Sequence, residues 1–228
     1  MFKNFTIDTD TALMYLARVI AFLTAIPIHE SAHAWVSYKL GDPTARNLKR
    51  ISLNPARHFD LMGALFMLIM GFGWAKPVPI NTGYYANRKF GMAVSSLAGP
   101  VSNFIFAFFL MILYKLTCIV YYTKSSTSFF YALMLILYFM VIINLSLAVF
   151  NILPVPPLDG SRIFLLFLPE RLYFGIMKYE RYIMIIFFAV LSSGIFDGAL
   201  RRMQTGLFNI VFDATMFIDI LFNVNFSG

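Results

Sequence analysis

Charged residues are scarce in this sequence, and their scarcity excludes a soluble globular protein. Only 13% of the 228 residues are charged, whereas 60% are hydrophobic and the mean hydropathy is +0.75. Soluble domains usually carry about 25% charged residues, and a single domain has too much surface to hide such an excess of apolar side chains. Lipid is the solvent that accommodates them. The sequence therefore predicts an integral membrane protein.

Cysteine is almost absent as well. The single residue, Cys118, lies in an apolar run and has no partner for an internal disulfide, so we interpret it as a small buried hydrophobic residue. A cleaved signal peptide is not expected, because Asp8 and Asp10 stand where a basic region would precede the first apolar run. The net charge of +7 is confined to short loops and forms no continuous basic surface, which excludes a nucleic acid as partner.

The apolar runs predict an all-α polytopic fold with about four transmembrane helices. We expect spans at about 11–40, 91–122, 129–153 and 182–196. The run 61–72 is too short to cross a bilayer and is interpreted as a re-entrant or interfacial segment, and the prolines of 73–81 favour an extended loop or hairpin. Residues 1–200 would form one membrane-embedded domain, and 201–228 an interfacial C-terminal helix.

Basic residues predict the orientation of these spans. Twelve of the 18 Lys and Arg lie in three connections, at 39–58, 73–90 and 154–181. Positively charged loops stay on the cytoplasmic side, so four crossings with both termini outside fit the pattern. Arg201 and Arg202 count mildly against it. We expect a multi-pass protein, in the plasma membrane, with these connections facing the cytoplasm.

The sharpest chemical signal is the H-E-x-x-H motif of His29, Glu30 and His33. Residues four apart on a helix lie about 40° apart around its axis, so both imidazoles project from one face and can bind one zinc ion. The glutamate beside the first histidine can take a proton from the attacking water. Three ionisable residues in an apolar helix are costly in lipid, and a bound metal explains their presence.

A catalytic zinc usually has three protein ligands, and the candidates for the third are His58, Asp60, Asp159 and Glu170. Asp159 is favoured, because it follows the proline-rich turn 154–157 directly after an apolar span. Such a turn is tolerated at membrane depth only where it lines a protein cavity, and Gly160 would give the backbone room beside the carboxylate. His58, in a basic loop expected to be solvated, remains the alternative.

Four segments, taken together, resemble the site-2 protease family of intramembrane metalloproteases, in its short form without PDZ or CBS domains. They are the H-E-x-x-H motif at 29–33, the loop 73–81 (GWAKPVPIN), the segment 98–103 (AGPVSN) and the segment 151–160 (NILPVPPLDG). The segment 53–60 is also similar to a loop of that family. These matches run from about residue 20 to 165.

The resemblance implies specific roles for these residues. His29, His33 and Asp159 would hold one Zn²⁺ per chain, and Glu30 would be the general base. Asn103 would help to place the substrate or polarise its carbonyl; a hydrogen bond between membrane helices is its alternative role. The loop 76–81 would pair with an unwound substrate strand.

The sequence thus predicts a zinc-dependent endopeptidase that cuts the transmembrane segment of a partner protein near the cytoplasmic face, as in regulated intramembrane proteolysis. Two alternatives use the same metal site: a non-catalytic membrane scaffold and a metal transporter. A scaffold would need a closed site with four ligands, and no strong fourth ligand is visible. A transporter usually contains paired repeats, and none is found. The oligomeric state is not readable.

Overall fold

The computed structural model describes residues 8–58, 60, 62, 63, 65 and 76–224, and this part of the chain contains helices and no strand. An all-α fold is therefore confirmed. The predicted re-entrant segment 61–72 lies almost wholly outside the described residues. Four helices are long: α1 (Thr9–Lys39), α4 (Arg88–Thr123), α5 (Ser128–Asn151) and α9 (Asp197–Ala214). The short elements are α2 (Thr44–Asn47), η1 (Pro55–Arg57), η2 (Thr82–Tyr84), α6 (Asp159–Leu165), α7 (Glu170–Lys178), α8 (Glu180–Ser192) and α10 (Met216–Leu221).

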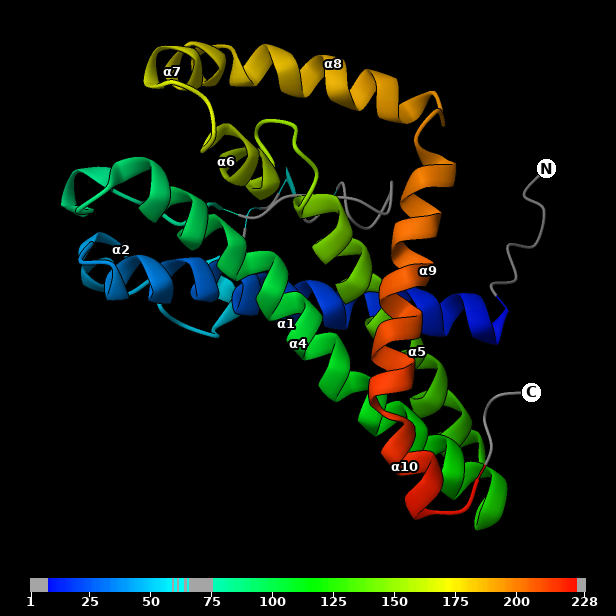
Figure 1. Cartoon of the computed structure of the whole chain (residues 1–228). Coiled ribbons are helices and arrows are strands. Elements are labelled where there is room, and N and C mark those ends of the chain that lie inside the picture. The colour runs from blue at the N-terminus through cyan, green and yellow to red at the C-terminus, as the bar shows by residue number, and fades with distance from the viewer. Residues whose placement is uncertain (1–7, 59, 61, 64, 66–75, 225–228) are drawn as a thin grey trace.

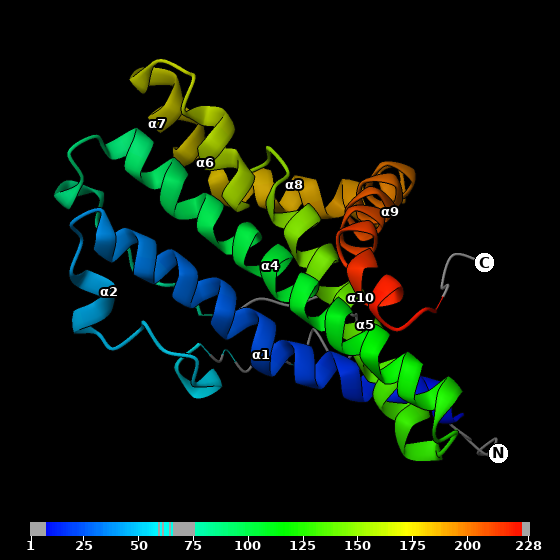
Figure 2. The same ribbon diagram turned by 60° about the horizontal axis from the view of Figure 1, so that its bottom comes forward.

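The long helices form a bundle in which α4 packs against both α1 and α5 (Figures 1 and 2). The start of α1 lies beside the start of α5, where Tyr131 donates a hydrogen bond to Asp10 (3.0 Å). The C-terminal end of α1, the start of α4 and helix α6 lie at the opposite end of the bundle (Figure 1). The segments that carry the predicted site therefore meet at one end.

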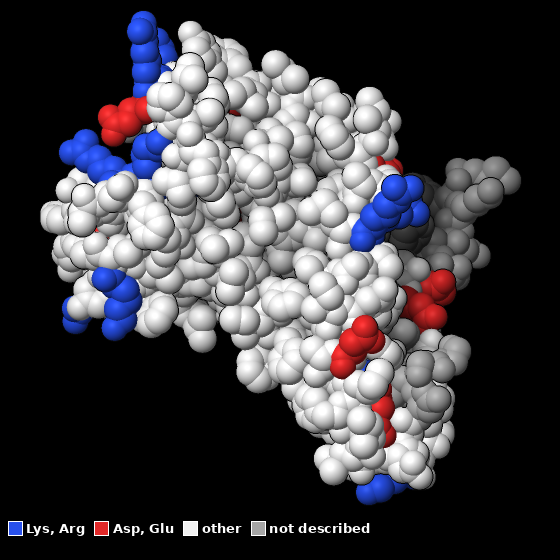
Figure 3. Space-filling model, viewed as in Figure 1, with Lys and Arg blue, Asp and Glu red and all other residues white. Residues whose placement is uncertain are grey.

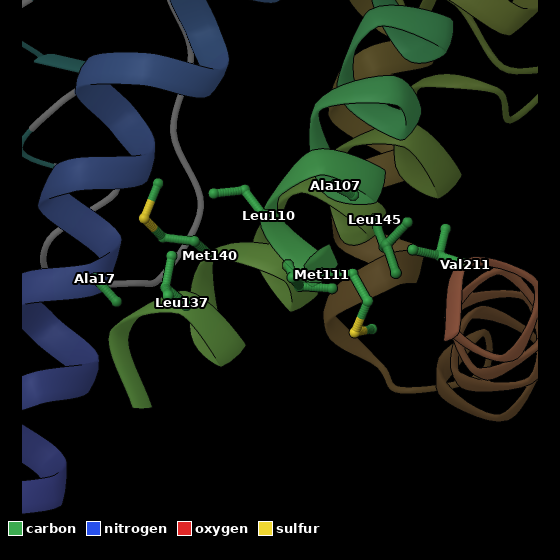
Figure 4. Close-up of a cluster of buried hydrophobic side chains, with 9 residues drawn as sticks. Ala17, Ala107, Leu110, Met111, Leu137, Met140, Leu145 and Val211 are labelled. Carbon is green, nitrogen blue, oxygen red and sulfur yellow. The ribbon is translucent and has the colours of Figure 1, made fainter. Parts of the chain in front are cut away.

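The core of the bundle is made of small and flexible apolar side chains from four helices (Figure 4). Ala17 of α1 and Ala107 of α4 are fully buried and let the helix backbones approach closely. Buried methionine and leucine side chains fill the remaining space, and Val211 brings α9 into the same cluster. Helix α9 is thus packed against the rest of the bundle.

The fourth predicted span differs from the helices that form. Residues 182–196 fall mostly on α8, which has 13 residues and is about 20 Å long, less than the ~30 Å of hydrocarbon in a bilayer. In the part of the chain that the structure describes, four helical segments are long and apolar enough to cross a membrane: 9–39, 88–123, 128–151 and 197–221. By length and composition the C-terminal segment therefore fits a span better than an interfacial helix, and the division of the chain into spans stays a prediction.

A span at 197–221 also changes how the basic residues divide between the two ends of the helices. Arg201 and Arg202 then follow directly after the connection 152–196, so fourteen of the 18 Lys and Arg lie at the same end. Figure 3 shows most of the visible basic side chains over the side that carries α2 and α7, a further basic group over the upper part of α9, and several acidic ones towards α10. The two arginines no longer count against the predicted orientation.

A buried ion pair fastens the C-terminal helices to α4. Lys115 of α4 has no exposed surface, and its Nζ lies 2.8 Å from Asp219 Oδ2 of α10. The same ammonium donates a hydrogen bond to the Phe212 carbonyl (3.0 Å) and lies 4.0 Å from the centre of that ring. Charges in an apolar surrounding are tolerated when they are paired, so these contacts explain how an apolar bundle can contain a lysine.

We expect Lys115→Met to destabilise the protein, because it leaves Asp219 buried without its partner. Breaking one side of a buried ion pair typically lowers the free energy of unfolding by about 3–5 kcal/mol, whereas replacing both partners with apolar residues costs little. Denaturant titration in detergent micelles would measure the loss, and adding Asp219→Leu should recover most of it. Lys124→Met removes an exposed lysine from the end of the same helix and serves as control.

Candidate metal centre

Helix α1 carries both histidines on one face, as its periodicity predicts. Their rings lie edge to face with centroids 4.6 Å apart, and both side chains are buried. The Nδ1 atom of His33 forms a 2.7 Å hydrogen bond with the Ser95 carbonyl of α4. Because a carbonyl can only accept, Nδ1 carries a proton, so in the neutral ring the lone pair lies on Nε2, the atom that can bind a metal. Ser95 is thus the outer partner that orients His33, a role that the sequence did not indicate.

Asp159 is the first residue of α6 and faces both histidines, although it lies 130 residues after His29 in the sequence. Its Oδ2 lies 3.0 Å from Nε2 of His29 and 3.2 Å from Nε2 of His33. All three potential ligand atoms lie within 4.8 Å of one another. Ligands that each lie about 2 Å from a zinc ion must be this close together. The donor set, two imidazoles and a carboxylate, fits a catalytic zinc site.

The charge of the Asp159 carboxylate suits it to bind a cation. Burial raises the pKa of this group, but the charge of a protonated His33 ring and hydrogen bonds from both histidines outweigh burial and hold the pKa below its ordinary range. The carboxylate is therefore ionised at neutral pH, as metal ligation requires.

Gly160 lets the chain turn tightly beside Asp159. A Cβ atom at this position would lie 2.1 Å from the Ile152 carbonyl oxygen and 2.6 Å from that of Leu153. These are backbone atoms and cannot rotate away, so only glycine fits. The prediction that Gly160 makes room for the backbone is confirmed, and the proline turn brings the start of α6 back against the end of α5.

Gly99 of α4 makes the closest backbone approach to the histidine pair. A Cβ atom there would lie 2.5 Å from atoms of both His29 and His33. Helix α4 runs through Gly99 and Pro100 as one helix from Arg88 to Thr123. Gly99 provides space for the two imidazoles, which no local pattern could indicate because α1 and α4 meet only in the folded bundle.

Glu30 lies next to the ligand cluster and contacts the extended segment 76–80. Its Oε2 accepts a hydrogen bond from the Val78 backbone N–H (3.0 Å), while Oε1 accepts none from the described residues. The described part of the predicted loop 73–81 therefore lies beside Glu30, the candidate base. This part of the loop forms no strand pairing.

Three further contacts hold this segment in place. Arg50 donates to the Lys76 carbonyl (2.6 Å), and the Lys76 N–H donates to the His58 carbonyl (3.0 Å). At the other end, the Asn81 N–H donates to the buried carboxylate of Asp42 (2.7 Å). Burial raises the pKa of Asp42, but hydrogen bonds from Thr44, Asn81 and Ser37 lower it more, so this anchor is charged at neutral pH.

Asn103 lies one helical turn after Gly99 and so on the same face of α4. Its side chain has no exposed surface, and neither its Oδ1 nor its Nδ2 atom has a hydrogen-bond partner among the described residues. The alternative role, a hydrogen bond between helices, therefore finds no partner there. Buried amides are almost always paired, so an unpaired one beside a candidate active site calls for a functional explanation.

The other candidate ligands lie outside the cluster. His58 is 1% exposed, so the expectation of a solvated residue is wrong; it ends η1, and its Nε2 bonds to the Ser52 carbonyl (2.7 Å). Burial lowers the pKa of His58. Asp60 accepts a hydrogen bond from the Gly63 N–H, and Glu170 is exposed on α7. Among the described residues, His29, His33 and Asp159 form the only group of three potential ligands.

Comparison with known proteins identifies the family. The family model described as "Peptidase family M50" matches residues 17–193. The chain is 37% identical over 175 residues to YwhC of Bacillus subtilis (strain 168), and the aligned region covers 74% of this chain and 77% of that protein. It is 25% identical over 163 residues to Rip2 of Mycolicibacterium smegmatis, and the aligned region covers 67% of this chain and 59% of that protein. Both relatives are named as candidate zinc metalloproteases.

No solved structure matches the chain. The family model covers well over half of it, and the ligand cluster and candidate base agree with that match. The chain therefore belongs to peptidase family M50, the site-2 protease family of zinc metalloproteases.

Proposed function

We propose that this protein is an intramembrane endopeptidase that cleaves transmembrane segments of other membrane proteins near the cytoplasmic face. One observation carries the proposal: a three-ligand cluster and a glutamate lie at one end of a bundle whose long helices are apolar enough to span a bilayer. A soluble peptidase has no need to place its catalytic groups on such helices, because charged residues there are costly in lipid.

His29, His33 and Asp159 would hold one zinc ion per chain, with an open position for water and substrate. Bound there, zinc would act as a Lewis acid on the scissile carbonyl and lower the pKa of the attacking water. Glu30 would accept the proton of that water and pass it to the leaving nitrogen. Its Oε1 accepts no hydrogen bond from the described residues, and the Val78 N–H, which bonds to Oε2, holds the carboxylate in position; both features support this role.

Asn103 would donate a hydrogen bond to the oxygen of the carbonyl under attack. Its fully buried amide, which has no hydrogen-bond partner among the described residues, supports this role, since a preorganised donor stabilises developing negative charge without reorganising. The amide is already removed from water in the free protein, so it forms a hydrogen bond with the substrate without a further desolvation penalty. Such a donor is worth more in the transition state than in the ground state.

Segment 76–81 would receive the unwound strand of the substrate. A transmembrane helix hides its amides in internal hydrogen bonds, so it must open before attack and needs replacement partners. Pro77 and Pro79 keep this segment extended, and contacts at its two ends fix it beside Glu30. An extended backbone anchored at both ends can pair with a second strand at low entropic cost.

The active site would face the cytoplasm. The end of the bundle that carries the ligand cluster also carries fourteen of the 18 Lys and Arg, if 197–221 is the fourth span. Cleavage would then release the cytoplasmic part of a substrate. The plasma membrane and a single catalytic domain are part of the same proposal.

Reconstitution tests the proposal directly. The full chain, loaded with zinc in phospholipid vesicles, is incubated with a panel of single-span membrane proteins, and new termini are mapped by mass spectrometry. We expect cuts inside apolar segments, in the half nearer the basic flank. Cuts confined to the soluble parts of these proteins would contradict intramembrane proteolysis and leave the metal site as that of an ordinary peptidase.

Asp159→Ala should lower zinc affinity by more than about 100-fold, because it removes a direct ligand and loss of even an outer partner can cost that much. Elemental analysis of the purified chain would show about one zinc in the wild type and none in the variant. Asp60→Ala removes a candidate carboxylate that lies outside the cluster and is the matched control. Zinc lost from both variants, or from neither, would refute the assigned ligand set.

A further inference from the structure

A cavity of about 150 Å³ lies at the basic end of the molecule, and none of the candidate metal ligands lines it. Its lining comes from four elements: η2 and α4, α6 and α7. One liquid water molecule occupies about 30 Å³, so the cavity has room for a group the size of a phosphate. The lining residues are Thr82, Arg88, Lys89, Met92, Arg162, Tyr173 and Met177.

Three cations line this cavity and no carboxylate does. Arg162 is paired with Glu180 (2.9 and 3.2 Å), so its charge is balanced. Lys89 donates to the Leu168 carbonyl, which carries no formal charge, and lies near the Tyr173 ring. Arg88 makes no hydrogen bond or ion pair with the described residues and is exposed. About two positive charges therefore remain unbalanced.

The position of two of these cations is unfavourable by itself. Arg88 and Lys89 are the first residues of α4, and the first turn of this 36-residue helix contains no acidic residue. The amino end of a helix carries partial positive charge, which stabilises anions and opposes cations. An anion that binds beside the two cations would offset this repulsion. The Phe90 N–H is not available to that anion, because it donates to the Asn87 side chain (3.0 Å), so the two side chains are the main donors. The pattern is expected of an anion site and not of a helix selected only for stability.

The surroundings of the cavity point to a lipid as the source of that anion. Met92, Met177 and Tyr173 supply an apolar side to the lining. Phe90 follows Lys89 in the chain, and Phe167 precedes Leu168, whose carbonyl accepts from Lys89. Both phenylalanines are exposed (54% and 82%), which suits contact with acyl chains and not with water. Helix α4 is a candidate span that begins at Arg88, so the cavity lies where a cytoplasmic headgroup layer would be.

We propose that this cavity binds the phosphate of an anionic phospholipid, with Arg88 and Lys89 as its main ligands and the acyl chains along the apolar side. The bound lipid connects α4 to α6 and α7. Because Arg162 lies one turn after Asp159 on α6, the lipid also steadies the helix that presents the third candidate metal ligand. The proposal concerns binding and stands whether or not the chain cleaves transmembrane segments.

Native mass spectrometry of the delipidated full chain tests the site. Phosphatidylglycerol and phosphatidylcholine are titrated separately, with thermal unfolding recorded for the same samples. We expect one phosphatidylglycerol retained per chain in preference to phosphatidylcholine, with a rise in the unfolding temperature. Arg88→Gln should weaken its retention about tenfold, as loss of a charge-assisted hydrogen bond does. Arg88 is exposed, so this variant is expected to fold.

Arg171→Gln is the matched control, because it removes an exposed charge from α7 without touching the cavity. Retention equal to the wild type in this variant is expected. An equal loss in both variants would mean diffuse attraction to surface charge and would overturn the site, as would equal retention of the two lipids. Inorganic phosphate that displaces phosphatidylglycerol and stabilises the chain as well would overturn the lipid assignment in favour of a soluble anion.

Discussion

Glu30→Gln abolishes cleavage in the vesicle assay while the chain keeps its zinc. Glutamine has the shape of glutamate and its carbonyl oxygen can still accept the hydrogen bond from the Val78 N–H, so segment 76–81 stays in place. Only the ability to accept a proton is lost. General-base catalysis contributes about 10²–10⁴-fold, so product should fall below detection in an end-point assay while elemental analysis still finds the metal.

Glu170→Gln provides the control for this experiment. It makes the same chemical change at an exposed carboxylate on α7, outside the ligand cluster. Cleavage at the wild-type rate is expected from this control. Wild-type cleavage by Glu30→Gln would instead assign the base to another group, and loss of zinc from that variant would make Glu30 a ligand.

Gly99→Ala removes both metal and activity by adding one methyl group. That methyl carbon would lie 2.5 Å from atoms of His29 and His33, well inside van der Waals contact. The imidazoles must rotate or α4 must move away from α1, and either change separates the ligand atoms from Asp159. We expect zinc affinity to fall by more than about 100-fold, since even indirect disturbance of a ligand can cost this much.

The measured stability of Gly99→Ala shows whether zinc binding is lost through the local clash or through unfolding of the whole protein. Alanine is favoured over glycine by about 1 kcal/mol in a helix interior, so propensity alone predicts a more stable protein. Gly206→Ala, a helical glycine of α9 with no atom within 4 Å of the added carbon, tests that propensity effect without the clash. Zinc binding and cleavage unchanged in Gly99→Ala would show that the site has more space than the structure indicates.

Local periodicity made the histidine pair predictable. The other residues of the site were harder to predict, because their roles depend on contacts between helices that are distant in sequence. The spacing of His29 and His33 fixes their common face in any helix, so the sequence sufficed. Asp159 was indicated by a proline turn at membrane depth. Gly99 and Ser95 act only because α4 packs against α1, and nothing near them in the sequence signals this contact.

Hydropathy has a related limit at the C-terminal helices. Asp213 and Asp219 indicated an interfacial helix there, and the apolar run 182–196 was preferred as the fourth span; this division stays a prediction. The structure pairs Asp219 with Lys115, 104 residues earlier, so the two charges balance each other inside the bundle. Summing hydropathy along one segment counts both charges as costs because it cannot include a partner on another helix.

The ion pair between α4 and α10 also has a consequence for biogenesis. Of the four candidate spans, 197–221 has the lowest hydropathy and is the last to be synthesised. Alone, its aspartates oppose entry into lipid, but by then Lys115 is already present on α4. We therefore expect the last helix to insert after α4 and by association with it, so that an orphan C-terminal fragment would stay out of the bilayer and be open to cellular proteases.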